Sequence, residues 1–146
     1  MVVCTPALGL RSPSQDAALL RDVVRRADGP VVLVGHGYGG AVIAHAATGA
    51  DHVVALCYVA AFGFDAGERL LDVINRFAPM PQANAAWTTD LPGDEAVLEG
   101  RELYLCVERF PQAYAGDLPL SVGAALAQAQ CPLAMGAPAD RSGPPA

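Results

Sequence analysis

The feature that most restricts the fold of this chain is a run of four aliphatic residues followed at once by four glycines within six positions. The run spans residues 31–34, the glycines lie within residues 35–40, and small or aliphatic residues follow. An uninterrupted apolar run of this kind is typical of a strand buried on both faces of a parallel sheet. The glycines predict a sharp turn, and the small residues predict a helix from about Gly39 to Thr48.

A second apolar run predicts a parallel neighbour for that strand. Gly49 to Asp51 would end the helix, and the residues from His52 to Val59 are again almost continuously apolar. A strand, a helix and a strand within about 30 residues form a βαβ unit, in which the two strands run parallel. The expected fold class is therefore α/β, with a mainly parallel sheet flanked by helices.

Weaker signals predict the remaining elements. Residues 12–15, Ser-Pro-Ser-Gln, offer a helix N-cap, a proline for the first turn and a glutamine at the third position. We expect the apolar face of that helix to comprise Ala17, Leu20, Val23, Val24 and Ala27. A short helix capped by Asp65 to Glu68 is expected to bury Leu70, Val73, Ile74 and Phe77.

The rest of the chain carries less information. Met1 to Cys4 is interpreted as the end of a strand, and the prolines around Trp87 indicate a loop. Residues 102–107 are compatible with a short strand or with the end of a helix. A helix is predicted from Leu120 to Gln130, with one apolar side made of Val122, Ala125, Leu126 and Ala129. Residues 136–146 are rich in proline, glycine and alanine, and we expect a poorly ordered tail.

Length and charge restrict the class of protein. A chain of 146 residues is expected to form one structural domain. The net charge is −6, and the nine cations, all arginine, form no cluster, which disfavours nucleic acid and anionic membranes as partners. No segment resembles a signal peptide or a membrane span, so the cytoplasm is the expected location. Cys4, Cys57, Cys106 and Cys131 form no C-x-x-C pair, so we expect reduced thiols and no metal site.

Residues 35–39, Gly-His-Gly-Tyr-Gly, have the G-x-S-x-G form with glycine at the central position. Together with Val-Val-Leu-Val before them, they resemble the nucleophile elbow of small bacterial esterases in the α/β-hydrolase superfamily, the branch shared with hydroxynitrile lyases. The resemblance continues through residues 53–63 and, less specifically, through a lid-like stretch and residues 142–146. It implies a partial α/β-hydrolase fold with three segments: a core fragment over 1–63, a partly helical lid-like segment over 64–135, and a flexible tail over 136–146.

The resemblance also assigns roles around the turn. Gly37 stands at the position of the nucleophilic serine, and the backbone N–H of Tyr38 would be an oxyanion donor. Gly35, Gly39 and Gly40 would supply the small residues that let strand and helix approach closely. The family implies carboxylic-ester hydrolysis of a small molecule without metal or cofactor.

The parts that do not match predict an incomplete enzyme. Glycine has no atom that attacks a carbonyl, and the family's catalytic acid and histidine would follow Ala146. We expect His36 to pack against the protein, and His45 and His52 to be structural or superficial, so none is a candidate base. As given, the chain is expected to be inactive or nearly so; whether it is a short protein or a truncated product stays open.

Two other functions remain open. Gly35, Gly37 and Gly40 also spell G-x-G-x-x-G, the dinucleotide-binding fingerprint, although the acid expected near the end of the second strand is absent until Asp65. Alternatively, the chain is a non-catalytic binding relic of a hydrolase. Three parallel strands with open edges would then favour a homodimer or a complementing partner.

Overall fold

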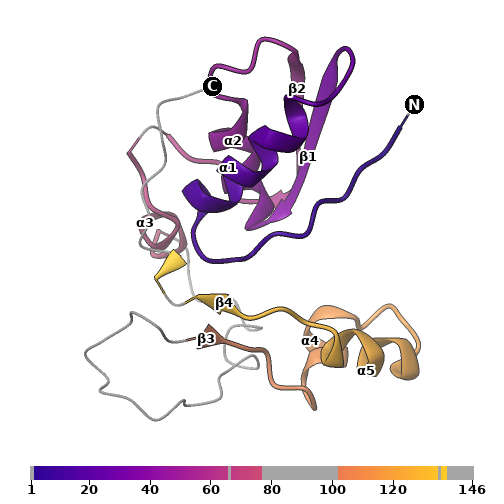
Figure 1. The fold of residues 1–146 in the computed structure, drawn as a ribbon. Helices are drawn as coiled ribbons and strands as arrows, with labels where there is room; N and C mark the ends of the chain where they lie inside the picture. Colours follow the sequence, from indigo (N-terminus) through magenta and orange to yellow (C-terminus); the bar gives the residue numbers. More distant parts are fainter. Residues whose placement is uncertain (1, 66, 77–101, 135, 138–146) are drawn as a thin grey trace. The chain divides into compact units, whose positions relative to one another are not determined.

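The computed structural model describes residues 2–65, 67–76, 102–134 and 136–137 (Figure 1). The contacts divide the chain into two compact units, Met1–Ile74 with Ala137–Ala146, and Asn75–Gly136. The first boundary between the two units falls after Ile74. We refer to the two parts as the N-terminal unit and the C-terminal unit.

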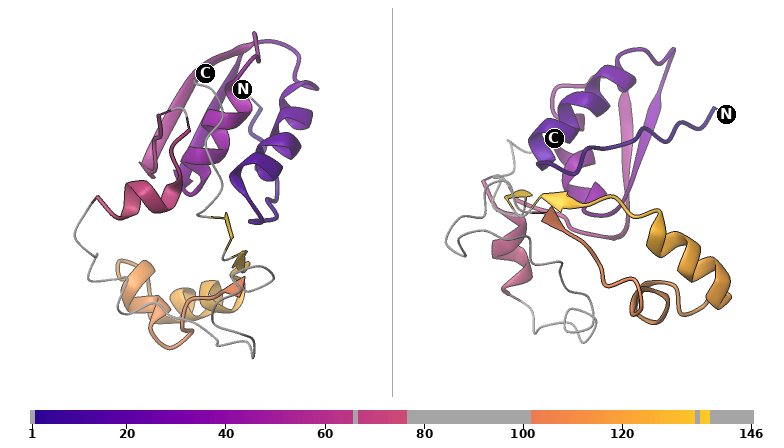
Figure 2. Two further views of the ribbon diagram at one scale, coloured as in Figure 1. Left: turned by 90° about the vertical axis from the view of Figure 1, so that its left-hand side faces the viewer. Right: turned by 60° about the horizontal axis from the view of Figure 1, so that its bottom comes forward.

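The N-terminal unit is built on a βαβ motif. Its elements are α1 (Pro13–Val24), β1 (Val31–Gly37), α2 (Gly39–Ala47), β2 (Val53–Ala61) and the short α3 (Leu70–Ile74). β1 and β2 pair in parallel, which confirms the predicted strand, helix and parallel strand. α2 packs against both strands and α1 packs against α2, so both helices lie on one side of the sheet (Figure 2, left).

The start of α1 follows directly from its sequence. The Ser12 hydroxyl accepts a hydrogen bond from the Gln15 backbone N–H at 3.2 Å, and Pro13 occupies the first turn, where it displaces no helical hydrogen bond. Ala17, Leu20 and Val24 are buried, as predicted. Val23 and Ala27 are not part of the buried face, because Val23 lies at its margin and Ala27 is exposed beyond the end of the helix.

The sheet is covered on one face only within the described residues, so the expectation that β1 is buried on both faces is wrong there. Leu33 is 6% exposed and joins the core formed with α1 and α2, whereas Val32 and Val34 are 55% and 63% exposed. Their neighbours on β2 in the same register, Ala55 and Cys57, are exposed as well. The physical reason is that both helices lie against the face that carries Leu33, and side chains alternate between faces.

The expected third strand is also absent from the described part of this unit. Residues 2–4 are not in a strand, so the N-terminal unit has a two-stranded sheet. At its other end, the Glu68 carboxylate accepts a hydrogen bond from the Asp65 backbone N–H at 2.7 Å ahead of α3, as a cap would. In α3, Leu70 and Val73 are buried, but Ile74 is 40% exposed. Phe77, the loop around Trp87 and residues 138–146 lie outside the described residues.

The C-terminal unit contains β3 (Glu102–Leu103), α4 (Phe110–Tyr114), α5 (Leu120–Gln128) and β4 (Leu133–Ala134), with β3 and β4 antiparallel. The predicted helix near 120–130 is present, but the predicted apolar face is wrong. Gly123 and Ala127 are buried, whereas Val122 and Leu126 are 43% and 44% exposed. A Cβ on Gly123 would lie 3.0 Å from the Pro111 Cβ, so α4 packs over the small residues of α5.

No helix in the described ranges combines the length and the apolar character that crossing a bilayer requires.

Candidate functional site

The turn after β1 is as sharp as the sequence predicts. β1 ends at Gly37, Tyr38 alone stands between strand and helix, and α2 begins at Gly39. Gly37 has φ +54°, in the left-handed region that glycine enters without steric penalty. Tyr38 has ordinary helical angles. Gly37 is therefore the apex of a strand–turn–helix, and the unusual backbone conformation is confined to it.

Two glycines allow strand and helix to approach this closely. A Cβ on Gly35 would lie 2.5 Å from the Gly39 carbonyl oxygen and 2.8 Å from the Gly40 nitrogen. A Cβ on Gly40 would overlap the Phe62 carbonyl oxygen and lie 2.9 Å from the Ala61 Cβ. In both cases the obstructing atoms belong mainly to the backbone, which cannot rotate away. Gly35 fits the steric role expected of it, and Gly40 carries the tighter contact that the sequence had suggested for Gly39.

Open space surrounds the other two glycines. A Cβ on Gly37 or on Gly39 meets no atom within 4 Å. At Gly37 this means that a side chain placed on the apex would project away from the surrounding protein. The arrangement thus has the geometry that presents a reactive side chain, with no side chain at that position.

The end of β2 closes against the turn through a bulge. The register passes from the pair His36↔Val59 to the pair Gly37↔Ala61, so Ala60 is an extra residue. Ala60 has φ +42°, a conformation that is strained for a residue with a side chain. Immediately after the bulge, the Phe62 backbone N–H donates to the Gly37 carbonyl oxygen at 3.1 Å. The sequence gives no signal for this bulge, because nothing distinguishes Ala60 from its alanine neighbour.

The side chain of Tyr38 points back into the protein. Its hydroxyl donates to Oδ2 of Asp16 on α1 at 2.8 Å, and its ring packs against the main core cluster. Asp16 is only 3% exposed. Sequence analysis missed this residue, since an acid in the first turn of a helix is ordinarily explained by the helix dipole.

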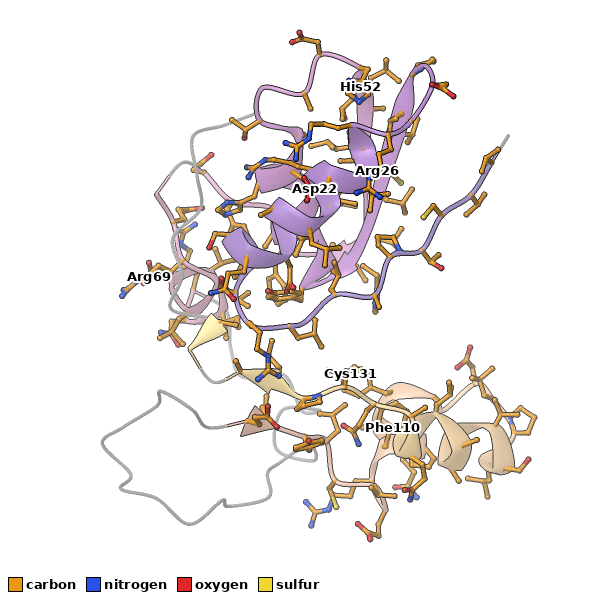
Figure 3. All side chains as sticks on the ribbon, in the orientation of Figure 1. Asp22, Arg26, His52, Arg69, Phe110 and Cys131 are labelled. Carbon is orange, nitrogen blue, oxygen red and sulfur yellow. The ribbon has the colours of Figure 1, made fainter. Side chains whose placement is uncertain are left out.

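The three histidines are not brought together at the turn. His52 precedes β2 at the end of the sheet opposite Gly37 (labelled in Figure 3), and its Nε2 lies 2.9 Å from the Val24 carbonyl oxygen. His45 is 6% exposed near the C-terminal end of α2, and the Arg21 guanidinium donates to its carbonyl oxygen. His36 is exposed, so the expectation that it packs against the protein is wrong.

Two described groups, neither of them within residues 35–40, have displaced pKa values. The Asp72 carboxylate, hydrogen-bonded to the Arg69 guanidinium at 2.7 Å and 2.9 Å, raises the pKa of Arg69 at the start of α3 (Figure 3). The Cys106 thiol donates to Glu108 at 2.9 Å and, as the main cause, lowers the pKa of that carboxyl group. Among the described residues, no three acids, cysteines or histidines are grouped as metal ligands.

The dinucleotide-binding interpretation finds less support. That fingerprint needs an acidic residue at the end of the second strand to hold a ribose hydroxyl. β2 ends at Ala61 and contains no acid, and Asp65 lies beyond the strand.

Comparison with protein families decides between these alternatives. Residues 4–146 match the α/β hydrolase family. This chain belongs to that family. For an α/β-hydrolase, a strand, a sharp turn and a helix in immediate succession form the nucleophile elbow, with the apex residue as the usual nucleophile. A search of curated proteins gave no significant match.

Solved structures support the same fold. A crystal structure described as a novel pyrethroid hydrolase, PytH, with BIF is 27% identical, with a TM-score of 0.57 over 74% of this chain and 43% of that chain. A second PytH structure, a histidine-to-alanine variant, is 26% identical, with a TM-score of 0.58 over 75% of this chain and 44% of that chain. The α/β-hydrolase chain described here therefore spans less than half the length of these relatives.

Proposed function

We propose that this chain carries the elbow of an ester-hydrolase-like protein in which glycine stands at the nucleophile position, so that it binds an ester-like small molecule without forming an acyl-enzyme at residue 37. The single observation that carries the proposal is the place of Gly37: at the apex, with φ +54° and open space in the Cβ direction. A serine there would present its hydroxyl to a substrate, whereas glycine offers no nucleophilic atom.

The backbone N–H of Tyr38 directly follows the apex, at the start of α2. Tyr38 is the N-cap of α2, and its side chain makes no capping hydrogen bond. The positive end of the helix dipole favours negative charge at the start of α2. We propose the Tyr38 N–H as an oxyanion donor that would polarise a bound carbonyl group.

The name of the solved relatives supports the class of chemistry. PytH is described as a pyrethroid hydrolase, and the elbow sequence of this chain resembles that of esterases. We therefore propose a small molecule that contains an ester bond as the ligand. In this proposal the Tyr38 amide orients the ligand. The step that breaks the bond would require a nucleophile that residue 37 does not supply.

The variant Gly37→Ser tests the proposal. A residue with a side chain at φ +54° is strained, so we expect the free energy of unfolding to fall by about 1–3 kcal/mol. We also expect no hydrolysis of a short-chain p-nitrophenyl ester above background, because the serine would lack a base that activates it. Urea denaturation followed by circular dichroism and a spectrophotometric esterase assay measure the two quantities.

Gly39→Ser is the matched control, because its Cβ also faces open space and its backbone needs no positive φ. It should leave both stability and background hydrolysis unchanged. Turnover by the unsubstituted chain would overturn the proposal. Strong turnover by Gly37→Ser would show that the chain holds a working base after all.

The bare face of the sheet favours a second function, self-association. On this face the exposed residues of β1 and β2 include no charged side chain; they comprise Val32, Val34, His36, Ala55, Cys57 and Val59. A chain of net charge −6 repels its own copies over most of its surface but not across an uncharged apolar face. Parallel strands are ordinarily covered on both faces, and these strands also have no further strand partner among the described residues. We propose that a second copy of the chain covers this face and its edges.

Sedimentation velocity tests this second candidate with the pair Val34→Lys and Leu19→Lys. Val34 lies on the bare face at 63% exposed, and Leu19 lies on α1 at 43% exposed. We expect the unsubstituted chain and Leu19→Lys to sediment as dimers and Val34→Lys to sediment as a monomer, because burying a lysine charge at an apolar contact is unfavourable. A monomeric unsubstituted chain, or a dimer that survives Val34→Lys, would exclude this interface.

A further inference from the structure

One buried carboxyl group joins the elbow to the N-terminal segment of the chain. Asp16 lies in the first turn of α1 and is 3% exposed. Its Oδ1 accepts a hydrogen bond from the Gly9 backbone N–H at 2.8 Å, and its Oδ2 accepts one from the Tyr38 hydroxyl, also at 2.8 Å. Each oxygen of one side chain therefore holds a different part of the fold, and the two parts are 29 positions apart in sequence.

At one end of this connection, Asp16 holds Tyr38, the residue that directly follows the apex. Only Tyr38 separates Gly37 from α2, so a restraint on its side chain also restrains the backbone position where the turn meets the helix. The ring packs against the core cluster, and its hydroxyl is fixed by Asp16. A tyrosine held at both the ring and the hydroxyl anchors its own Cα, and with it the start of α2, against α1.

The Gly9 end holds a strained turn. The next residue, Leu10, has φ +54°, which is unfavourable for a residue with a side chain. The Arg11 Nε–H donates to the Gly9 carbonyl oxygen at 2.8 Å, and Leu8 packs partly against the core. Strain of this kind persists only where the surroundings impose it, and the hydrogen bond from Gly9 to Asp16 is a direct link from this turn to the rest of the unit.

We propose that Asp16 is a positioning residue that couples the turn at residues 9–11 to the nucleophile elbow. If either donor is lost, the carboxyl group is no longer held from both sides, and its bond to the other donor opens more often. The position of Tyr38 at the start of α2 then depends on whether the N-terminal segment is docked. What the coupling would regulate rests on the function proposed for the Tyr38 N–H; the coupling itself rests on the two hydrogen bonds alone.

Native-state hydrogen exchange followed by NMR tests the coupling in the full chain without ligand. In Tyr38→Phe, which removes only a hydroxyl, we expect the Gly9 amide to exchange about tenfold faster relative to the core amides of Val42 and Ile43. A hydrogen bond to a charged group contributes enough to shift such an opening equilibrium by a factor of ten or more. In Asp16→Asn, the Gly9 amide should also exchange faster relative to the core amides, and the double variant should resemble Asp16→Asn.

His52→Ala is the matched control, because it also removes a hydrogen bond to α1, at the Val24 carbonyl oxygen. It should raise exchange at the core amides and at Gly9 by the same factor. If the exchange rate of the Gly9 amide relative to the core amides is unchanged in Tyr38→Phe, the proposal is wrong. It is also wrong if the effects of Tyr38→Phe and Asp16→Asn on Gly9 exchange add up in the double variant. If Asp16→Asn does not fold, Tyr38→Phe alone decides. Because no ligand is present, this result can fail while ester binding at the elbow holds, and the reverse is equally possible.

Discussion

Gly35→Ala is expected to lower the free energy of unfolding by more than about 3 kcal/mol, at the upper end of what overpacking costs. The added methyl carbon would lie 2.5 Å from the Gly39 carbonyl oxygen, 2.6 Å from the Gly39 carbonyl carbon and 2.8 Å from the Gly40 nitrogen. All three are backbone atoms in the first turn of α2, so no side chain can move aside. The strand and the helix would have to separate, and the core between them would open.

Gly39→Ala is the control for this prediction. Its Cβ meets no atom within 4 Å, and alanine is the better helix former by up to about 1 kcal/mol. We therefore expect equal or slightly higher stability, measured by urea denaturation of the two variants side by side. Equal stability of Gly35→Ala and Gly39→Ala would mean that β1 and α2 do not approach as closely as the structure has them.

The contrast between these glycines shows which part of the site was predictable. The four glycines within residues 35–40 predicted a sharp turn, and the turn is present with Gly37 at its apex. The sequence could not rank Gly39 against Gly40, because the atoms that exclude a side chain from Gly40 belong to Ala61 and Phe62 at the end of β2. That contact depends on the bulge at Ala60, which local sequence does not encode.

Burial shows a similar division. The apolar runs correctly located β1 and β2, since a run of aliphatic residues favours a strand whatever covers it. The apolar runs do not predict how many faces of the sheet are covered, because this depends on where the helices pack. In the described residues both helices lie on the Leu33 face, and the residues that would match a second layer stay exposed.

The connection through Asp16 was beyond sequence reasoning for a different reason. Its two partners, Gly9 and Tyr38, contribute a backbone N–H and a hydroxyl, which form no recognisable motif with an aspartate. The packing of α1 against α2 brings Tyr38 to Asp16, and the path of the chain before α1 brings the Gly9 N–H to the same carboxyl group. The predicted N-cap at Ser12 was correct, and it places Asp16 in the first turn without indicating which side chains it meets.

Leu33→Ala should cost about 2–5 kcal/mol of unfolding free energy, whereas Val34→Ala, one residue further along β1, should cost less than about 1 kcal/mol. Leu33 is 6% exposed and belongs to the cluster with Leu20, Val42 and Ile43, so its truncation leaves a cavity that the close-packed helices cannot fill. Val34 is 63% exposed and loses few contacts.

The two variants form an internal control, because both shorten an aliphatic side chain in the same strand and differ mainly in the face that carries it. Urea denaturation at low protein concentration measures the pair. Repeating it at high concentration tests the proposed self-association: a penalty for Val34→Ala that grows with concentration indicates that a second copy covers the bare face, since association stabilises the folded state by mass action. Equal costs at both positions and all concentrations would instead mean that β1 is buried on both faces and that the one-sided sheet is incorrect.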